Sequence, residues 1–369
     1  MAYDGNQYSN RVDATTERIL NAKVVDNILQ SRTYASRLVG MGKPMVGKTF
    51  DYAIKITDSS AGEFFSGMET LNTAASDTLI ILSYAQTQFQ QPAVNILGEA
   101  MANQGEAQTI NLAKYKLDEA VAEAVQKWGR AIYGTGSSNQ ALGLGAIVDD
   151  GTTVTTIGGQ SRSTYSVLNA TVTAATNGLV SLQVLATLED SITRAGMASE
   201  EPNINLTTKT VWTLYEQLLT PTMRADYQSS GYNQIALRGS DIVKPAQLKG
   251  AAGFNALAFR GKAVIKDDDC TSGVWFMLNE RYFEWRGRTQ VPPEWAAEGL
   301  QKVTLGEAGT IEGVSGSAEY APPSSVGWFH MPYMALPLNA GMVARYYCFG
   351  NVTASQFRCQ GKETGITTI

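Results

Sequence analysis

The sequence predicts an α+β fold built around one unusually long helix. Three observations carry this prediction: an apolar stripe of helical period over Glu106 to Tyr133, an alternating strand pattern at Phe50 to Ile56, and further strand patterns towards the C-terminus. The chain has 369 residues, of which 44% are hydrophobic and 17% charged. It can therefore bury a sizeable core and fill two domains, or one domain with large excursions.

The long helix is predicted from apolar residues that recur at spacings of three and four, with charged residues on the opposite face. At about 1.5 Å per residue, a helix of about 28 residues spans roughly 40 Å. Glycines at Gly134 and Gly136 suit the left-handed turn that ends a helix. A spine of this length suits a flat, extended subunit, which favours assembly over a binding pocket. The apolar positions are Ile110, Ala113, Leu117, Ala120, Val121, Ala124, Val125, Trp128 and Ile132.

An extended hairpin is predicted before this helix. The strand at Phe50 to Ile56 is followed by a polar tip, residues 58–77, and by a second strand at about 78–89. The tip of roughly 20 residues exceeds the usual two to five, and loops of that length are commonly functional. It holds three large apolar residues, Phe64, Phe65 and Met68. They either tuck back onto their own hairpin or contact a neighbouring subunit, and we favour the second.

The N-terminal segment reads as a polar arm with one helix. Residues 13–30 carry a weaker helical pattern within a stretch rich in Asn, Gln, Ser and Thr. An arm of this kind cannot bury its apolar residues alone, so neighbours must cover them. The candidate residues for contact between subunits are Phe64, Phe65, Met68, Ile19, Leu20 and Val24.

The remaining elements follow from capping and alternation. The patterns predict a helix from Ser181 to a stop at Gly196, a strand at 204–207, a helix ended by Pro221, strands at 262–266 and 274–278, a Gly-rich loop at 306–323, and closing strands at 342–358 around a turn at Gly350-Asn351.

Composition excludes several classes of function. The net charge of −5 and the pI near 5.2 argue against a surface that grips nucleic acid. No apolar stretch approaches the ~18–20 residues that cross a bilayer, and the polar start lacks the order of a signal peptide. The cysteines Cys270, Cys348 and Cys359 are odd in number and follow no metal spacing, which favours free thiols in a reducing cytosol.

One short motif matches a nucleotide-binding pattern. Residues 42–49, GKPMVGKT, fit the phosphate-binding P-loop letter for letter. That loop works only between a strand and a helix whose N-terminal amides face the phosphates. Here the residues that follow alternate with a period of two, so the helix is missing. A P-loop nucleotide hydrolase is therefore the weakest alternative, and we interpret the match as coincidence.

No catalytic constellation stands out. His330, the one histidine, lies in an apolar run without a nearby carboxylate, and we expect it to be packed. Asp267, Asp268 and Asp269 follow a strand, lack the spacing of a calcium-binding loop, and are expected to form a solvated turn. We therefore expect no enzymatic activity, no cofactor and no metal.

Several stretches in order resemble one family. They are VQKWGRAIYGTGSSNQALGLGAIV at 125–148, PNINLTTKTVWTLYEQLL at 202–219, FRGKAVIKDDDCTSGVWFMLNERYFEWR at 259–286, and the closing segments 350–351 and 358–361. With the arm and hairpin, the chain resembles the major capsid proteins of tailed bacteriophages, which have the HK97-like fold. Ala263 stands where many members of that family have proline.

The resemblance implies a division of the chain. It assigns residues 1–45 to an N-arm, 46–92 to an E-loop that reaches over a neighbour, 93–140 to the P-domain with the spine helix, 141–336 to the A-domain, and 337–369 to the closing strands of the P-domain.

The resemblance also implies a function and a set of partners. It implies a major capsid protein that assembles from hexamers and pentamers into an icosahedral phage head, within the cytoplasm of a bacterial host. The head would enclose packaged double-stranded DNA without sequence-specific binding. Because the arm starts almost at Met1, scaffolding, like the portal and decoration proteins, is expected as a separate chain. The alternative is the shell of an encapsulin-like nanocompartment, which shares the fold.

Overall fold

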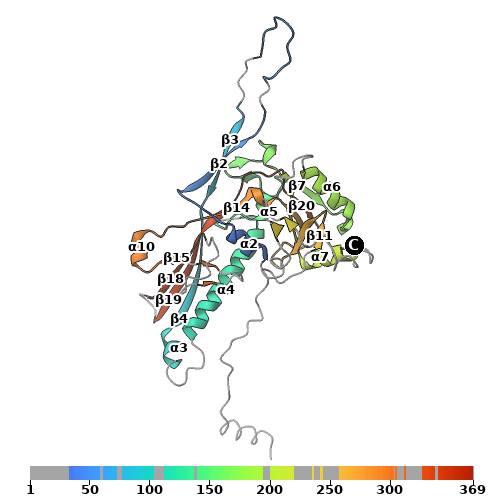
Figure 1. The fold of residues 1–369 in the computed structure, drawn as a ribbon. Coiled ribbons are helices and arrows are strands. Elements are labelled where there is room, and N and C mark those ends of the chain that lie inside the picture. Colours follow the sequence, from blue (N-terminus) through green and yellow to red (C-terminus); the bar gives the residue numbers. More distant parts are fainter. Residues whose placement is uncertain are drawn as a thin grey trace, which may run out of the picture.

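The computed structural model describes most of the chain after the arm. The described residues are 33–58, 61–72, 77–103, 112–136, 139–193, 200–219, 257–302, 326–336 and 340–368, with two-residue strands at 235–236, 242–243, 304–305 and 311–312. Two mixed sheets with their helices form the body, and a hairpin projects from it (Figure 1). The expected contact residues Ile19, Leu20 and Val24 lie outside the described residues.

The spine helix is α4, Leu112–Tyr133. The part predicted before Leu112 lies outside the described residues down to position 104. Its apolar stripe packs on the sheet that contains β4 and β19, where a cluster of Ala93, Ala120, Val121, Ala344 and Tyr346 is buried. The helix ends at Tyr133, and Gly136 adopts a φ of 69°, as the glycine-rich stop predicts. No helix among the described residues combines the length and the apolarity needed to cross a membrane.

The sheet beneath the spine has the order β1-β14-β19-β18-β15, and β4 also pairs with β19. Its long member, β19, pairs with β4 on one side and with β18 and then β14 on the other. The strands are β1 (Lys43–Pro44), β4 (Thr87–Ile96), β14 (Phe283–Gly287), β15 (Gln301–Lys302), β18 (Trp328–Ala335) and β19 (Gly341–Ala354).

The predicted turn at Gly350-Asn351 is wrong, because both residues lie inside the continuous strand β19. Gly350 pairs with Gly287 of β14 and with Thr87 of β4. A Cβ atom at this position would lie 2.6 Å from Cζ2 of Trp285 and 2.5 Å from the carbonyl oxygen of Arg286. The glycine therefore makes room for an indole ring and does not reverse the chain.

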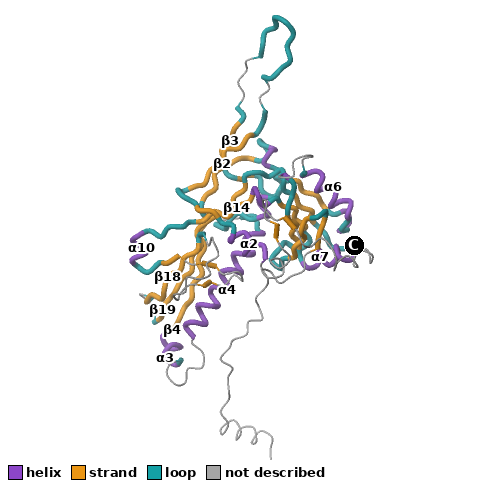
Figure 2. The backbone as a smooth tube through the Cα atoms, viewed as in Figure 1, coloured by secondary structure: helices purple, strands orange, loops and turns teal. Residues whose placement is uncertain are grey.

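The second sheet has the order β11-β12-β8-β13-β20-β7, and two helices cover it (Figure 2). The helix α6 has Ser181 as its N-cap and Thr193 as its C-cap, so it ends before the predicted Gly196, which lies outside the described residues. The elements are β7 (Thr171–Ala174), β8 (Ile204–Thr207), β11 (Leu257–Phe259), β12 (Lys262–Lys266), β13 (Trp275–Leu278), β20 (Gly361–Thr364), α6 (Leu182–Ile192) and α7 (Lys209–Leu218).

The two sheets interleave along the sequence. Strands β14 and β18, from the range 141–336 expected to form the A-domain, belong to the sheet beneath the spine. Strand β20, from the range 337–369 expected to close the P-domain, belongs to the second sheet. Each sheet thus draws strands from both sides of the expected boundaries, because strand pairing is non-local.

The hairpin and the small elements complete the fold. Strands β2 (Thr49–Lys55) and β3 (Leu79–Ala85) pair antiparallel from Thr49↔Ala85 to Lys55↔Leu79. The remaining elements are α2 (Thr33–Gly40), α3 (Leu97–Ala102), α5 (Leu144–Ile147), α10 (Pro293–Ala297), β5 (Thr156–Ile157), β6 (Gln160–Ser161), β9 (Ile235–Ala236), β10 (Ile242–Val243), β16 (Thr304–Leu305), β17 (Ile311–Glu312), and the 3₁₀ turns η2 (Ser166–Leu168), η3 (Thr176–Gly178) and η5 (Glu280–Tyr282).

Candidate assembly surface

The hairpin tip, residues 61–72, presents apolar side chains to solvent. Phe64 and Met68 are fully exposed, and Phe65 is 63% exposed. The alternative that they tuck back onto their own hairpin is therefore wrong. The tip bonds to itself instead: the Asn72 N–H donates to Oε1 of Glu63 at 2.6 Å, and the Ser66 N–H donates to Oε2 of Glu69 at 3.3 Å.

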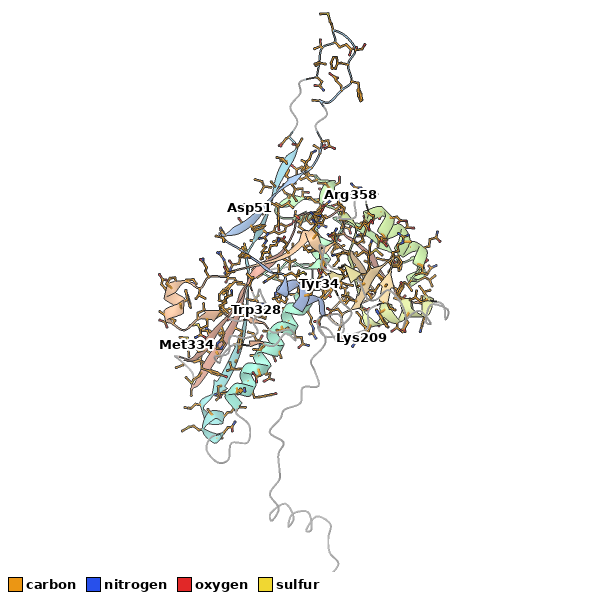
Figure 3. The ribbon with its side chains drawn as sticks, in the orientation of Figure 1. Tyr34, Asp51, Lys209, Trp328, Met334 and Arg358 are labelled. Carbon is orange, nitrogen blue, oxygen red and sulfur yellow. The ribbon has the colours of Figure 1, made fainter. Side chains whose placement is uncertain are left out.

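The hairpin stem, β2 and β3, has one face in the core and one in solvent. Leu82 and Tyr84 are buried, whereas Leu79 and Ile81 on the opposite face are more than half exposed. This alternation is the period of two expected for a strand with one covered face. Exposed apolar side chains thus lie on both the tip and the stem, the parts of the chain that project from the body in Figure 3.

The base of the stem is fastened to the body from the spine-side sheet. The Tyr84 hydroxyl donates to the carbonyl oxygen of Ala354 at 2.7 Å, and the Tyr52 hydroxyl donates to Oε2 of Glu284 at 3.2 Å. The Arg286 guanidinium lies over the Phe50 ring, 4.0 Å from its centroid.

A second fastening comes from the turn between β5 and β6. The Ser83 N–H donates to the carbonyl oxygen of Gly158 at 2.9 Å, and the Gln160 side-chain amide donates to the carbonyl oxygen of Ile81 at 3.1 Å. Gly158 has a φ of 56°, and a Cβ there would lie 2.8 Å from Cβ of Leu82. Held from two sides, the stem aims the tip away from the body (Figure 1).

The P-loop match forms a short loop that leads into the stem. Its residues follow α2, pair as β1 with β14, and run straight into β2, so the helix that phosphate binding needs is not there. Val46, Gly47 and Lys48 are exposed. The structure thus agrees with the interpretation of this motif as a turn, and the arrangement does not fit a nucleotide hydrolase.

Comparisons with known proteins address the fold as a whole. No protein-family model matches the chain, and no curated protein matches its sequence. Among solved structures, the capsid of Cyanophage A-1(L) superposes with a TM-score of 0.61 at 12% identity, covering 96% of this chain and 98% of that chain. The chain has the HK97-like capsid fold. The α+β prediction and the resemblance to that fold are therefore confirmed.

The capsid fold occurs in more than one kind of shell. The capsid of Myoviridae Phage XM1 matches with a TM-score of 0.53 at 12% identity, covering 94% of this chain and 96% of that chain. The holo-SrpI encapsulin complex from Synechococcus elongatus PCC 7942 matches with a TM-score of 0.53 at 9% identity, covering 99% and 96%. The fold therefore fits both a phage capsid and an encapsulin shell.

A second set of exposed apolar residues, the spine-end patch, was not predicted. Its residues come from the adjacent ends of β4, α3, β18 and β19, which the pairings Ile96↔Gly341 and Ala335↔Met342 bring together. The apolar run at 92–97 was the available signal, but strand alternation does not say which face stays uncovered. The exposed members are Val94, Ile96 and Met334 on one face of the sheet, Met342 on the other face, and Leu97 and Met101 of α3.

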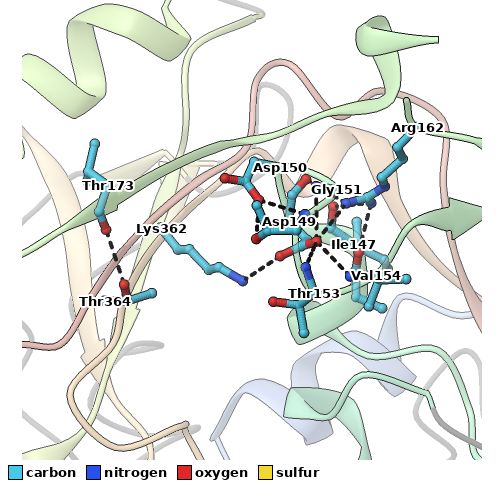
Figure 4. Close-up of polar contacts among 12 residues, drawn as sticks. Ile147, Asp149, Asp150, Gly151, Thr153, Val154, Arg162, Thr173, Lys362 and Thr364 are labelled. Atoms are coloured by element: carbon cyan, nitrogen blue, oxygen red, sulfur yellow. Dashed lines mark hydrogen bonds and ion pairs between the residues drawn. The ribbon is translucent and has the colours of Figure 1, made fainter. Parts of the chain in front are cut away.

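A buried ionic network connects the segment 146–162 to Lys362 of β20 (Figure 4). The Asp149 carboxylate accepts the N–H groups of Gly151, Thr153 and Val154 through Oδ2 and lies 3.5 Å from Nζ of Lys362. Burial opposes ionisation, but these N–H donors and Lys362 together lower the pKa of Asp149 below its ordinary value. Arg162, also buried, donates to the carbonyl oxygens of residues 146, 147 and 149. The Asp-Asp-Gly sequence at 149–151 was the only signal of this turn.

The aspartate run at 267–269 is not the solvated turn that the sequence predicted. Asp267 is buried and accepts the N–H of Tyr34 at 3.1 Å, and burial raises its pKa. Asp268 pairs with Lys209 of α7 at 2.8 Å, and Asp269 pairs with Arg130 of α4 at 3.4 Å. The three carboxylates therefore connect α2, α7 and α4, and this prediction failed because their partners are distant in sequence. Within the described ranges, no cluster of His, Cys, Asp or Glu could hold a metal ion.

The remaining reactive residues are packed. His330 is buried in β18 with its ring 4.7 Å from that of Tyr346, and burial lowers its pKa. Cys270, Cys348 and Cys359 are buried and form no disulfide, in agreement with the expected thiols. Buried cysteines of this kind are typical of core residues.

Proposed function

We propose that this chain is the major capsid protein of a tailed bacteriophage, which assembles through hexamers and pentamers into an icosahedral head around packaged double-stranded DNA. One observation carries the proposal: on a capsid fold, a rigidly fastened stem holds Phe64, Phe65 and Met68 in solvent. Exposure of these apolar side chains to water is unfavourable in an isolated subunit, and a neighbouring subunit can cover them. Contacts repeated over many copies then stabilise the assembly.

The named parts of the fold support this function. In the proposal, residues 46–92 are the E-loop, the spine helix with its sheet is the P-domain, and the second sheet with α6 and α7 is the A-domain. Residues 1–45 are the N-arm, with Ile19, Leu20 and Val24 as further contacts between subunits. Like the tip, these residues need a neighbour because their own segment offers no core.

The charge of the chain agrees with a wall around DNA. A net charge of −5 gives weak repulsion from phosphates, so packaged DNA can slide without sequence-specific binding. Scaffolding, portal and decoration proteins are proposed as separate partners, and assembly as an event in the host cytoplasm. The proposed subunit has no enzymatic activity and no cofactor.

A second candidate is the shell of an encapsulin-like nanocompartment. It is favoured by the match to the SrpI encapsulin complex, which covers 99% of this chain. Both functions need the same uncovered tip, so the subunit alone does not separate them.

Electron microscopy tests the proposal. The purified chain should form closed icosahedral particles, and a protein that stays monomeric at high concentration would contradict both candidates. Particles isolated from cells that carry the gene among its natural neighbours should contain nuclease-protected DNA and one portal vertex. Closed cages filled with protein cargo would favour the encapsulin-like candidate instead.

A further inference from the structure

The loop before the hairpin gathers positive charge from two distant parts of the chain. We name Lys43, Lys48, Arg286 and Arg288 the basic cluster. Lys43 pairs in register with Arg286 across β1 and β14, and Arg288 donates through Nη2 to the carbonyl oxygen of Gly47 at 2.6 Å. Two of the four cations, Lys43 and Lys48, belong to the loop 43–48, and these contacts bring Arg286 and Arg288 against it.

The compensating negative charge at the basic cluster is small. Lys43 and Arg286 share a single carboxylate, that of Glu284. Arg288 donates to two neutral oxygens, Oε1 of Gln86 at 2.6 Å and the carbonyl of Gly47. On a chain with a net charge of −5, this is a local surplus of positive charge.

An exposed apolar side chain lies in the same loop as Lys43 and Lys48. Val46 is 83% exposed, although its neighbour Met45 is buried and donates its N–H to the carbonyl oxygen of Gly287 at 2.7 Å. Because the loop is anchored on one side by Met45 and on the other by Arg288, Val46 is held outward. The surface thus offers one exposed apolar side chain in a loop that carries two cations and accepts a hydrogen bond from a third.

The hairpin tip has the complementary character. Within residues 61–72, the charged side chains are Glu63 and Glu69, and both stand next to the exposed apolar residues. Both carboxylates accept hydrogen bonds from backbone N–H groups of the tip itself, and residues 61–72 contain no cation that could neutralise them. An apolar surface flanked by carboxylates fits an apolar surface flanked by cations.

The tip of the same chain cannot occupy its own basic cluster. Strand β2 begins directly after the loop and runs seven residues towards the tip, which is about 23 Å of extended chain at roughly 3.3 Å per residue. The tip lies beyond that stem, away from the body (Figure 1). The occupant must therefore come from another molecule.

We propose that the basic cluster with Val46 is the docking site for the hairpin tip of a second copy of this chain. The inference rests on the proposed function and names the surface that covers the tip. Because the two surfaces differ, the contact is heterologous, and repeating it around an axis closes a ring. In this proposal, the sequence GKPMVGKT serves to dock a neighbouring subunit and not to bind a nucleotide.

A charge swap tests the docking site. Lys48→Glu and Glu69→Lys should each lower the fraction of protein that sediments as particles by about tenfold, because each places like charges together. The double variant should restore most of that loss. Lys302→Glu, an exposed lysine of β15, is the matched control and should leave the yield unchanged. A double variant no better than the single ones would overturn the docking site.

A cross-link gives a second, independent readout. Val46→Cys with Phe65→Cys should form disulfides between subunits when particles are oxidised, while the three native cysteines are buried. Particles that assemble without such cross-links would refute the docking site and leave the proposed function standing, whereas absence of particles from the unmodified chain would refute the function. Binding of inorganic tripolyphosphate that Lys48→Glu abolishes, with particle yield unchanged, would also overturn the docking site in favour of an anion site.

Discussion

Large apolar side chains are buried in the tryptophan cluster of the body, whereas they are exposed at the hairpin tip. Trp128 lies with its ring centroid 5.0 Å from that of Trp285 and 6.0 Å from that of Trp328, and all three are buried. Phe64 and Met68 are fully exposed, and Phe65 is 63% exposed. The body therefore supplies its own core, whereas the tip contributes nothing to the fold of its own chain. The difference separates residues that stabilise the subunit from residues that join subunits.

The largest effect on stability is expected in the tryptophan cluster. Trp285→Ala should lower the free energy of unfolding of unassembled subunits by about 3–5 kcal/mol, because it leaves a cavity beside Trp128 and Gly350. Urea denaturation followed by fluorescence measures this change. A loss below about 1 kcal/mol would show that the cluster is not the core of the body.

A smaller loss is expected in the buried network of Asp149. Asp149→Asn should cost about 1–3 kcal/mol at pH 7, because it removes the charge that faces Lys362 and Arg162. The folded-state pKa of Asp149 is lowered, so its contribution is present above the unfolded pKa and is lost as pH falls through the folded one. The difference between the two proteins should therefore shrink in acid. Asp118→Asn, at an exposed position of α4, is the control, and an equal loss in both would contradict the role of the network.

Glu363 is expected to give the opposite pH dependence of the free energy of unfolding. Both carboxylate oxygens of this buried residue lack a hydrogen-bond partner among the described residues, and burial raises its pKa from 4.5 to about 7. The folded protein keeps a proton that the unfolded chain releases, so the free energy of unfolding falls as pH rises between these values. Glu363→Gln should therefore stabilise unassembled subunits by about 1–2 kcal/mol at pH 8 and have little effect at pH 4. The exposed control Glu298→Gln should show no such trend, and destabilisation by Glu363→Gln at pH 8 would contradict this account.

The smallest effect on subunit stability is expected at the tip. Phe64→Ser with Phe65→Ser should change the free energy of unfolding by less than about 0.5 kcal/mol, because neither ring is buried in the subunit. The same variant should nevertheless lose most of its particles in sedimentation. Trp295→Ser on α10, which replaces another exposed aromatic residue, is the matched control. A tip variant that unfolds more easily yet still assembles would reverse the comparison.

Local patterns were sufficient to predict much of the fold. The strand at 262–266 and the spine helix through Tyr133 were predicted because alternation and helical period are properties of neighbouring residues. The turn at Gly350-Asn351 failed because the reason for the glycine is an indole 65 positions away, which no local pattern records. The interleaving of the two sheets escaped prediction for the same reason.

Of the two surfaces in the proposed contact, only the hairpin tip was predicted from the sequence. The length and composition of the tip indicated exposed apolar residues, and the structure places Phe64, Phe65 and Met68 in solvent. The basic cluster could not be predicted, because Lys43 meets Arg286 only through pairing of β1 with β14. Asp267 shows the same limit, since the Tyr34 N–H that it accepts is 233 positions away.

A cryo-EM map of assembled particles tests the central claim most directly, namely that a second copy covers the hairpin tip. The account predicts a closed shell in which residues 61–72 of each subunit rest on its neighbour, with the side chains of Phe64, Phe65 and Met68 shielded from solvent. A shell in which these side chains stay uncovered, or are buried within their own subunit, would contradict it.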